Sequence, residues 1–349
     1  MKGRIAVLDS LGGRAAAALI VDGKLEDLLI DPPDDGTPRP GAIYRAVAER
    51  PMKGQNGIML ALGDGQKGYL RQAKGISPGT SMLVQVTSQV EDGKAPPVTI
   101  RLLFKGRYGI VTPGAKGLNV ARSIRDEAER ERLAEIAHEA MEDAPDGTGL
   151  ILRSAAAEVD AAAIFEELAS LLATCQEVLA EAGSNGPQLL LAAPTADYIA
   201  WRDWTDPDPD QVFDSPGSFE TQFVWDLIEG LKQPDVALSA QAFMSIEPTR
   251  ALIAVDVNTG GDFSFAAGLK ANLACARDLP RQLRLRGLGG QVVIDFAPMV
   301  KKYRIAVEQA LKRALRLDAV DTNIVGWTPL GHLELQRKRE RLMLSDLLV

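Results

Sequence analysis

The sequence is poor in cysteine and histidine. Its 349 residues include only two cysteines, Cys175 and Cys275, which stand far apart and form no CxxC pair. The sequence therefore indicates neither a disulfide framework nor a thiolate zinc site, and we expect a reduced, cytoplasmic setting. The two histidines, His138 and His332, lie near no serine or cysteine nucleophile motif. We expect both to be structural or solvated.

Long apolar runs and common short motifs are also missing. No uninterrupted apolar stretch approaches the ~18 residues of a membrane span. Asp9 and Arg14 interrupt the apolar part of the N-terminus, which is therefore not a convincing signal peptide. We expect no membrane association. The motifs GxSxG and GxxxxGK[ST] do not occur, so neither a serine-hydrolase elbow nor a phosphate-binding P-loop is indicated.

The chain has an acidic excess, with a net charge of −8 and a pI near 5.1. This balance argues mildly against a nucleic-acid binder, because phosphate contacts need lysine and arginine. One segment differs, however, since only Asp278, Asp295 and Glu308 oppose its basic residues. These basic residues are Arg277, Arg281, Arg284, Arg286, Lys301, Lys302, Arg304, Lys312, Arg313 and Arg316. Such a run either forms a local nucleic-acid-binding patch or is simply a solvated helix face.

The first hundred residues are rich in short strand patterns. Strands between residues 5 and 30 include a hairpin turn at Asp22-Gly23. The Pro, Gly and Asp cluster at residues 31–41 predicts a loop and a domain boundary. Residues 42–100 contain about five short strands separated by glycine-rich turns, a pattern that suits a small barrel such as an OB-fold.

Helices and strands share the rest of the chain, which predicts an α/β, multidomain fold class. Residues 123–142 and 161–183 have apolar residues at helical spacing, with the strand GLILRSA between them. The last third alternates strand and helix, as in an α/β layered arrangement. Its elements are expected at residues 251–258, 269–286, 291–296 and 303–318. Pro280 should bend or interrupt the first of its helices.

The stretch LIAVDVNTGG carries the clearest chemical signal. It predicts a strand of small apolar residues with one carboxylate, Asp256, in the middle. Alternate residues of a strand share a face, so Asp256 and Asn258 point the same way, opposite to Val255 and Val257. The Asn258 amide can then donate a hydrogen bond to Asp256 and fix its orientation.

A second stretch, GGQVVIDF, repeats this design around Asp295. Two carboxylates at strand ends beside a basic helix suit Mg²⁺, which takes one or two carboxylates, several waters and phosphate oxygens. The alternative is that Asp256 and Asp295 each cap a helix or pair with an arginine. Two matching contexts, one with Asn258 two residues on, favour a metal site.

Taken together, AVDVNTGG, LKANLACARDLPRQLRLRGLGGQVVIDF and GHLELQRKR closely resemble the catalytic core of the ribonuclease E/G family. The resemblance continues upstream through GAIYRAVAE and GIMLALGDGQKGYL, which look like the OB-fold barrel of that family. It implies four parts: an RNase H-like domain (residues 1–36 and 199–232), an OB-fold RNA-binding barrel (37–105), a 5′-sensor-like region (106–198) and a DNase I-like catalytic domain (233–349).

The resemblance implies a magnesium-dependent endoribonuclease. A metal-activated water would attack a phosphodiester of single-stranded RNA and leave 5′-phosphate and 3′-hydroxyl ends. Asp256 and Asp295 match the catalytic, metal-binding aspartates, and Asn258 matches the orienting asparagine. Six more residues match RNA-contacting positions of the family: Tyr69 and Lys94 in the barrel, the backbone of Gly106 and Ile110, and the side chains of Arg153 and Ser154 around a 5′-phosphate.

The sequence also departs from the family pattern. Pro298 replaces a nearby acid, Met59 replaces a barrel aromatic, and Thr322 falls where a basic residue often helps the phosphate pocket. The CPxC zinc-link of the family does not occur, so zinc-linked oligomers are not expected. These departures keep an alternative open, namely an RNA-binding protein of the same scaffold with little or no nuclease activity.

Overall fold

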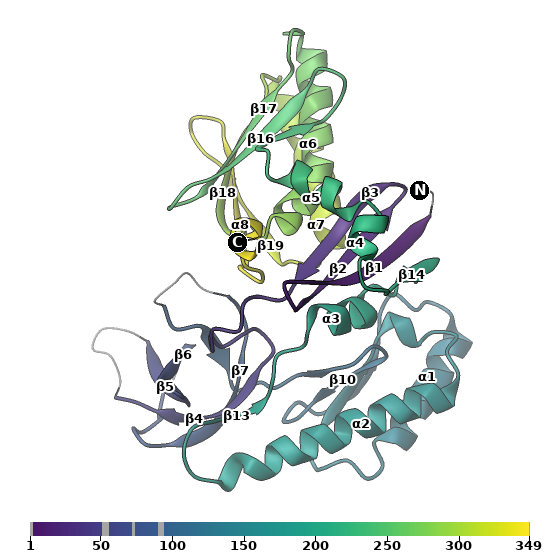
Figure 1. The fold of residues 1–349 in the computed structure, drawn as a ribbon, viewed down its shortest axis with the longest axis vertical. Helices are drawn as coiled ribbons and strands as arrows, with labels where there is room; N and C mark the ends of the chain where they lie inside the picture. The colour runs from purple at the N-terminus through teal and green to yellow at the C-terminus, as the bar shows by residue number, and fades with distance from the viewer. Residues whose placement is uncertain (1–2, 51–55, 72–73, 90–93, 349) are drawn as a thin grey trace. The chain divides into compact units, whose positions relative to one another are not determined.

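The computed structural model describes residues 3–50, 56–71, 74–89 and 94–348. The chain divides into two compact units, residues 1–33 with 211–349, and residues 34–210 (Figure 1). None of the described helices is both long and apolar enough to traverse a lipid bilayer.

The first unit begins with a four-stranded sheet in the order β14-β1-β2-β3. Its strands are β1 (Arg4–Leu11), β2 (Arg14–Val21), β3 (Lys24–Ile30) and β14 (Gln211–Phe213), and the short helices α4 (Ser218–Thr221) and α5 (Val224–Leu231) follow. Asp22 and Gly23 both have positive φ in the β2–β3 turn, as the Asp-Gly hairpin signal predicts. Phe219, Val224 and Ile228 are buried in the core shared with this sheet.

The same unit contains a six-stranded sheet in the order β15-β16-β17-β18-β20-β19. Its strands are β15 (Asp235–Ala237), β16 (Phe243–Pro248), β17 (Ile253–Asn258), β18 (Gly290–Asp295), β19 (Thr322–Trp327) and β20 (Leu333–Arg337). Strands β17 and β18 are parallel, and the other neighbouring pairs are antiparallel. Helices α6 (Phe265–Leu285) and α7 (Arg304–Leu317) supply buried residues to its core.

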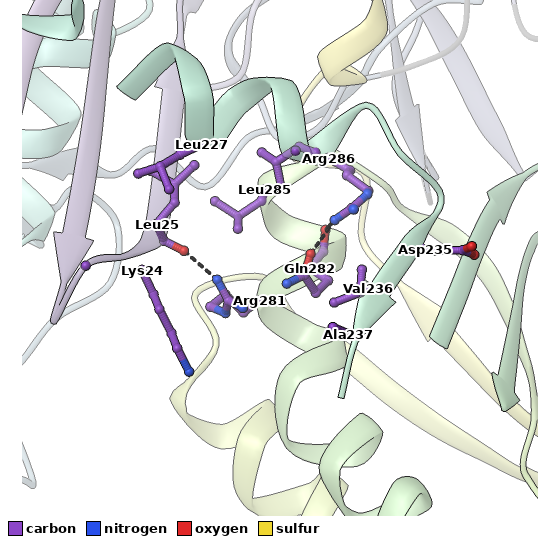
Figure 2. Close-up of a pocket in the computed structure, with 13 residues that line it drawn as sticks. Lys24, Leu25, Leu227, Asp235, Val236, Ala237, Arg281, Gln282, Leu285 and Arg286 are labelled. Carbon is purple, nitrogen blue, oxygen red and sulfur yellow. Dashed lines mark hydrogen bonds between the residues drawn. The ribbon is translucent and has the colours of Figure 1, made fainter. Parts of the chain in front are cut away.

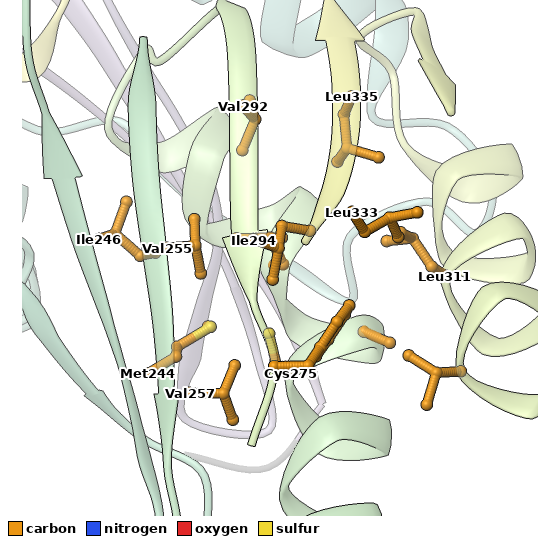
Figure 3. Packing of buried hydrophobic residues seen from close by; sticks show 14 of the residues in the cluster. Met244, Ile246, Val255, Val257, Cys275, Val292, Ile294, Leu311, Leu333 and Leu335 are labelled. Carbon is orange, nitrogen blue, oxygen red and sulfur yellow. The ribbon is translucent and has the colours of Figure 1, made fainter. Parts of the chain in front are cut away.

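The core of this sheet lies on one face only. Val255 and Val257 of β17 and Val292 and Ile294 of β18 pack with Cys275 of α6 (Figure 3). Period-2 alternation therefore leaves the intervening residues of both strands on the opposite face. Pro280 was expected to bend or interrupt helix α6, and the helix continues through it. The expected interruption is therefore wrong, and the expected bend stays a prediction. The short elements η3 (Lys301–Tyr303) and α8 (Leu344–Leu347) complete the unit.

The second unit contains a closed five-stranded barrel that resembles an OB-fold. Its strands are β4 (Ile43–Ala48), β5 (Gly57–Gly63), β6 (Gln66–Arg71), β7 (Ser81–Val86) and β8 (Pro97–Thr99). They pair in the order β4-β5-β6-β8-β7, and β7 closes the ring by pairing with β4. Strand β13 (Gln188–Leu191) adds to β4 from outside the ring. The barrel predicted from residues 42–100 is confirmed.

The rest of the second unit is a smaller sheet with helices. Strands β9 (Phe104–Lys105), β10 (Gly109–Thr112), β11 (Leu118–Val120) and β12 (Gly149–Leu152) form it in the order β11-β12-β10-β9. The helices are α1 (Glu127–Ala140), η1 (Ser154–Ala156), α2 (Ala161–Ala180), η2 (Glu181–Gly183) and α3 (Ala196–Asp203). The mixed α/β fold class is confirmed, whereas the finer division into four domains stays a prediction.

Candidate active site

Asp256 and Asp295 are direct neighbours on two adjacent strands. They are register partners in the parallel pair β17–β18, each at or near the end of its strand. Adjacent strands of a sheet lie ~4.7–4.9 Å apart, so the two residues face each other across a single strand spacing. The sequence places these aspartates 39 positions apart (295 − 256), and the parallel register brings them together.

Both carboxylates lie on the open face of the six-stranded sheet. Asp256 and Asp295 are exposed, whereas the flanking residues Val255, Val257 and Ile294 are buried on the other face. This alternation agrees with the faces predicted from the sequence. Two acidic groups side by side repel each other unless a cation lies between them. The arrangement can therefore hold a divalent cation between hard oxygen donors.

Asn258 holds Asp256 in place. Its amide Nδ2 donates a 2.7 Å hydrogen bond to Oδ2 of Asp256, two residues earlier on the same face of β17. The bond orients the carboxylate and leaves its other oxygen available. The geometry matches the interaction expected from the spacing of the two residues.

The alternative roles for the two aspartates are not realised. In the described parts of the chain, no lysine or arginine forms an ion pair with Asp256 or Asp295, and neither side chain caps a helix. The same parts contain no group of three or more His, Cys, Asp and Glu side chains that could hold a metal ion. The candidate site is thus a two-carboxylate site, with room for water and phosphate oxygens as further ligands.

The loop that follows Asp295 is fixed by helix α6. The Asn272 side chain is fully buried and bonds twice to Ala297, donating from Nδ2 to the carbonyl (2.9 Å) and accepting from the amide at Oδ1 (3.0 Å). Gly268 packs so closely that a Cβ there would lie 2.3 Å from the Pro298 carbonyl oxygen. These contacts tie the carboxyl end of β18 to the first turns of α6. Asn272 was not singled out by the sequence patterns.

Two further polar side chains extend the row of the two aspartates across the open face. Ser245 on β16 is the register partner of Asp256, and Asp235 on β15 is the register partner of Ser245. The Ser245 hydroxyl forms a short hydrogen bond with the Asp235 carboxylate. Sequence reasoning missed both residues because their position depends on antiparallel pairing.

His332 borders the other end of the row. Its Nε2 lies 3.8 Å from Oδ1 of Asp295. The sequence predicted a structural or solvated histidine. His332 and Asp295 are far apart in the sequence, so no local pattern indicated this contact. Its neighbour Leu333 is the register partner of Ile294, which explains why His332 reaches the end of β18.

The basic run between Arg277 and Arg316 divides into two groups. Arg284 and Arg286 are buried, and Arg281 is half-buried and bonded to Asp278. Arg304 is also half-buried, with its guanidinium over the Trp327 ring. The remaining members of the run are exposed, and these are Arg277, Lys301, Lys302, Lys312, Arg313 and Arg316. The buried arginines cannot contact an RNA strand, so a phosphate-binding patch could only use the exposed group.

Arg284 lies at the centre of a buried ion network. It contacts the carboxylates of Glu26, Asp27 and Asp318, and Asp318 also pairs with the fully buried Arg337 at 2.6 Å. Burial alone would lower the pKa of Arg284, but the three carboxylates outweigh it and hold its pKa above the ordinary value. This network joins β3, α6 and β20 within the first unit and has a structural role.

Arg286 lines a separate pocket of about 300 Å³ in the same unit, together with Leu25, Leu227 and Gln282 (Figure 2). Its guanidinium donates to the Gln282 side chain and to the Gln233 carbonyl. Burial, assisted by the neighbouring charge of Arg281, lowers the pKa of Arg286 to about 10. The pocket contains neither Asp256 nor Asp295, so it is distinct from the candidate site.

The two barrel residues expected to meet RNA differ in exposure. Tyr69 lies half-buried on β6, opposite Met59 on β5. A Cβ on Gly57 would come within 2.4 Å of the Tyr69 ring, so the glycine makes room for the ring. Lys94 is exposed in the segment before β8. Tyr69 can present part of its ring to a base, and Lys94 can present a charge.

The residues expected around a 5′-phosphate come together only in part. Arg153 donates to the Gly106 carbonyl (2.6 Å) and forms an ion pair with Asp203 (2.8 Å), and Ser154 follows it at the start of η1. The Gly106 amide donates to the Gly109 carbonyl, and Ile110 pairs with β9 and β12. A phosphate would therefore compete with Asp203 for the Arg153 guanidinium.

An internal carboxylate occupies the loop beside this group. Glu167 of α2 accepts hydrogen bonds from the amides of Arg107 (2.9 Å), Tyr108 (2.7 Å) and Gly109 (3.1 Å). Three consecutive amides that converge on one carboxylate form an anion-binding nest. The sequence gave no sign of this interaction, because α2 and the loop are about 60 residues apart.

Among known protein families, one has a model that matches most of this chain. The family model described as "Ribonuclease E/G family" matches residues 104–222 and 214–340. These ranges include Asp256, Asn258, Asp295 and His332. Their union, residues 104–340, is well over half of the chain.

Several curated proteins are similar to the chain. Ribonuclease E of Synechocystis is 28% identical, with 95% of this chain and 56% of the relative covered. Ribonuclease G of Escherichia coli K12 is 27% identical, with 78% and 62% covered. A chloroplastic ribonuclease E/G-like protein of Arabidopsis thaliana is 28% identical, with 76% and 31% covered. The chain thus spans little more than half the length of the first two relatives.

Proposed function

The chain belongs to the ribonuclease E/G family, and from this membership we propose that it is an endoribonuclease that cleaves single-stranded RNA. Water would attack a backbone phosphodiester, the bond from phosphorus to the 3′-oxygen would break, and the products would carry 5′-phosphate and 3′-hydroxyl ends. Its biological role would lie in RNA processing or decay.

One observation carries the proposal. Asp256 and Asp295 are register partners on the open face of a sheet, and Asn258 orients the first of them through a 2.7 Å hydrogen bond. We assign both carboxylates to catalysis and cation binding, and Asn258 to positioning. No arginine or lysine in the described part of the molecule neutralises the pair, which leaves the carboxylates available for a cation.

The donor set fits magnesium. Two carboxylates with an open, solvent-exposed face are what Mg²⁺ requires, because it keeps several waters and takes phosphate oxygens as further ligands. When bound, Mg²⁺ would lower the pKa of a coordinated water and neutralise charge on the reacting phosphate. Asp256 and Asp295 would hold it, and Asn258 would keep Asp256 in the correct orientation.

We assign the RNA path to residues of the second unit. Tyr69 can stack on a base, an interaction worth ~1–3 kcal/mol per base and tolerant of sequence, and Lys94 can contact the backbone. A 5′-monophosphate would be bound by Arg153, Ser154 and the backbone of Gly106 and Ile110. Because Arg153 is paired with Asp203, we expect the preference for a 5′-monophosphate to be modest.

We further propose a cytoplasmic location. The two cysteines belong to different units, and both are buried and unpaired. Burial raises the pKa of Cys175 to about 11 and raises the pKa of Cys275 still further. Thiols of this kind suit a reducing compartment. Oligomers linked by zinc are not part of the proposal.

The test is cleavage of a labelled single-stranded oligoribonucleotide with and without Mg²⁺, on substrates with a 5′-monophosphate and a 5′-hydroxyl. We expect Mg²⁺-dependent cleavage that a double Asp256→Asn/Asp295→Asn variant loses while still binding RNA. Cleavage by the double variant at the unmodified rate would refute the site. Magnesium-independent RNA binding without any cleavage would favour the alternative, an RNA-binding protein of the same scaffold.

A further inference from the structure

His332 is held at the candidate site by a tight turn. It directly precedes β20 in the connection from β19, and its backbone makes two hydrogen bonds with Thr328. The Thr328 amide donates to the His332 carbonyl (2.8 Å), and the His332 amide donates to the Thr328 hydroxyl (3.1 Å). The preceding Gly331 has φ +100, a conformation that glycine adopts easily. The backbone of the turn therefore fixes the position of the His332 Cα atom, from which the imidazole extends.

The register of β18 and β20 places this imidazole beside Asp295. Ile294 of β18 pairs with Leu333 of the antiparallel strand β20. Asp295, the residue after Ile294, therefore lies beside His332, the residue before Leu333. Nε2 of His332 is 3.8 Å from Oδ1 of Asp295, and about one third of the histidine side chain is exposed (34%). His332 is thus neither a buried core histidine nor a fully solvated one.

The two carboxylates have matching nitrogen neighbours. Asp256 accepts a hydrogen bond from Asn258 at 2.7 Å, and Asp295 has His332 at 3.8 Å. The contact between Asn258 and Asp256 is a hydrogen bond. The distance between His332 and Asp295 is about 0.8 Å longer than the usual N–H···O distance. Hydrogen bonds of catalytic groups are often long in free enzymes and shorten in the complex with substrate.

We propose that His332 is a positioning residue for Asp295, the counterpart of Asn258 for Asp256. With Mg²⁺ and RNA bound, Nε2–H would donate to Oδ1 of Asp295 and would leave the other carboxylate oxygen for the ion. The neutral Nε2–H tautomer and the imidazolium both donate from this atom, so the role does not depend on the histidine charge. This inference rests on the proposed function, because it requires Asp295 to be an ion ligand.

The experiment compares two substitutions at His332. His332→Leu removes the N–H donor, and His332→Gln restores one with a similar reach. His138→Leu is the matched control, since His138 is the other histidine and is exposed on α1 of the second unit. Calorimetric titration of Mg²⁺ into each protein gives a readout that does not depend on cleavage. Steady-state kinetics on the oligoribonucleotide then separates kcat from KM.

We expect His332→Leu to weaken Mg²⁺ binding about 10–100-fold, the usual effect of losing a group that orients a metal ligand. It should lower kcat and leave the KM for RNA unchanged, while His332→Gln recovers most of both losses. Unaltered Mg²⁺ affinity and kcat in His332→Leu would overturn this inference alone. A change confined to KM would overturn it as well, since the imidazole would then contact RNA. No Mg²⁺ binding or cleavage by the unmodified protein would overturn the proposed function too.

Discussion

Two groups of acidic residues in the first unit have opposite environments. Asp318 is almost completely buried, with 1% of its side chain exposed, and contacts both Arg284 and Arg337. Asp295 is 65% exposed and has His332 at 3.8 Å, while Asp256 beside it accepts a hydrogen bond from the Asn258 amide. The buried carboxylate is paired with positive charges of the protein itself, and the exposed carboxylates are not.

The difference separates carboxylates that are paired within the fold from carboxylates that are open to solvent. A buried charge is costly unless an opposite charge and hydrogen bonds compensate it. Asp318 has two arginines as ion-pair partners, and its Oδ1 accepts a hydrogen bond from Arg284, whereas its buried Oδ2 accepts none among the described residues. Asp256 and Asp295 are like charges on neighbouring strands, which destabilises the sheet slightly. The described residues supply no compensating charge to this pair on the open face, and we propose that a cation from outside the chain supplies it.

The largest effect is expected from removing charge in the buried network. In Asp318→Asn, Arg284 and Arg337 lose a shared partner and stay buried. Breaking a buried ion pair on one side costs about 3–5 kcal/mol, so the free energy of unfolding should fall by this amount. Chemical denaturation followed by circular dichroism measures it. A loss below about 1 kcal/mol would show that the network is not essential to the fold.

A smaller effect is expected at the orienting asparagine. Asn258→Ala removes the hydrogen bond to Asp256 but neither carboxylate, so we expect cleavage to fall about 10–100-fold, as for other groups that orient metal ligands. The unfolding free energy should change little, because Asn258 is only half-buried. The matched control is Asn323→Ala on β19, an exposed asparagine of the same sheet. Equal cleavage activity of the Asn258→Ala and Asn323→Ala variants would show that Asn258 has no role in the site.

Much of this site follows from local sequence patterns. Strand alternation and turn signals act over a few residues. They therefore predicted the faces of β17 and β18, the Asn258–Asp256 hydrogen bond and the five-stranded barrel. The sequence patterns grouped Asp256 and Asp295 into one candidate cation site, but they did not predict the parallel register that aligns the two residues. Nothing in the local pattern fixes which residues of two strands become partners.

The unpredicted features all depend on contacts between distant segments. His332 reaches Asp295 through the pairing of β18 with β20, and Glu167 fills the amide nest at Arg107–Gly109 from another helix. The continuity of α6 through Pro280 has the same origin, since Leu279 and Leu283 on either side are fully buried in the core. Tertiary packing there outweighs the local preference of proline to end a helix.

Substitution in the exposed pair Asp256 and Asp295 should change the free energy of unfolding in the opposite direction from substitution in the buried network. Asp256→Asn removes one of two like charges on neighbouring strands, so we expect the unfolding free energy to stay constant or rise by about 0.2–1 kcal/mol. Thermal unfolding without Mg²⁺ measures the change, and added Mg²⁺ should stabilise only the unmodified protein. A destabilised Asp256→Asn variant would mean that the carboxylate supports the fold, as Asp318 does.

The smallest expected effect comes from an acid of the second unit that has its own cationic partner. The hydrogen bonds that Glu129 accepts from Arg132, together with one from the Glu158 amide, lower its pKa from 4.5 to about 2. Because the folded pKa is depressed, its contribution to stability is complete above pH 4.5 and is lost as the pH falls towards 2. Arg132→Ala should therefore raise the Glu129 pKa in an NMR titration and flatten the decline of stability between pH 4.5 and 2.

An unchanged Glu129 pKa in this variant would assign the shift to the Glu158 amide and to the start of helix α1. Carboxylates held by backbone amides would then form a class apart from carboxylates held by arginine, and only the second class resembles Asp318.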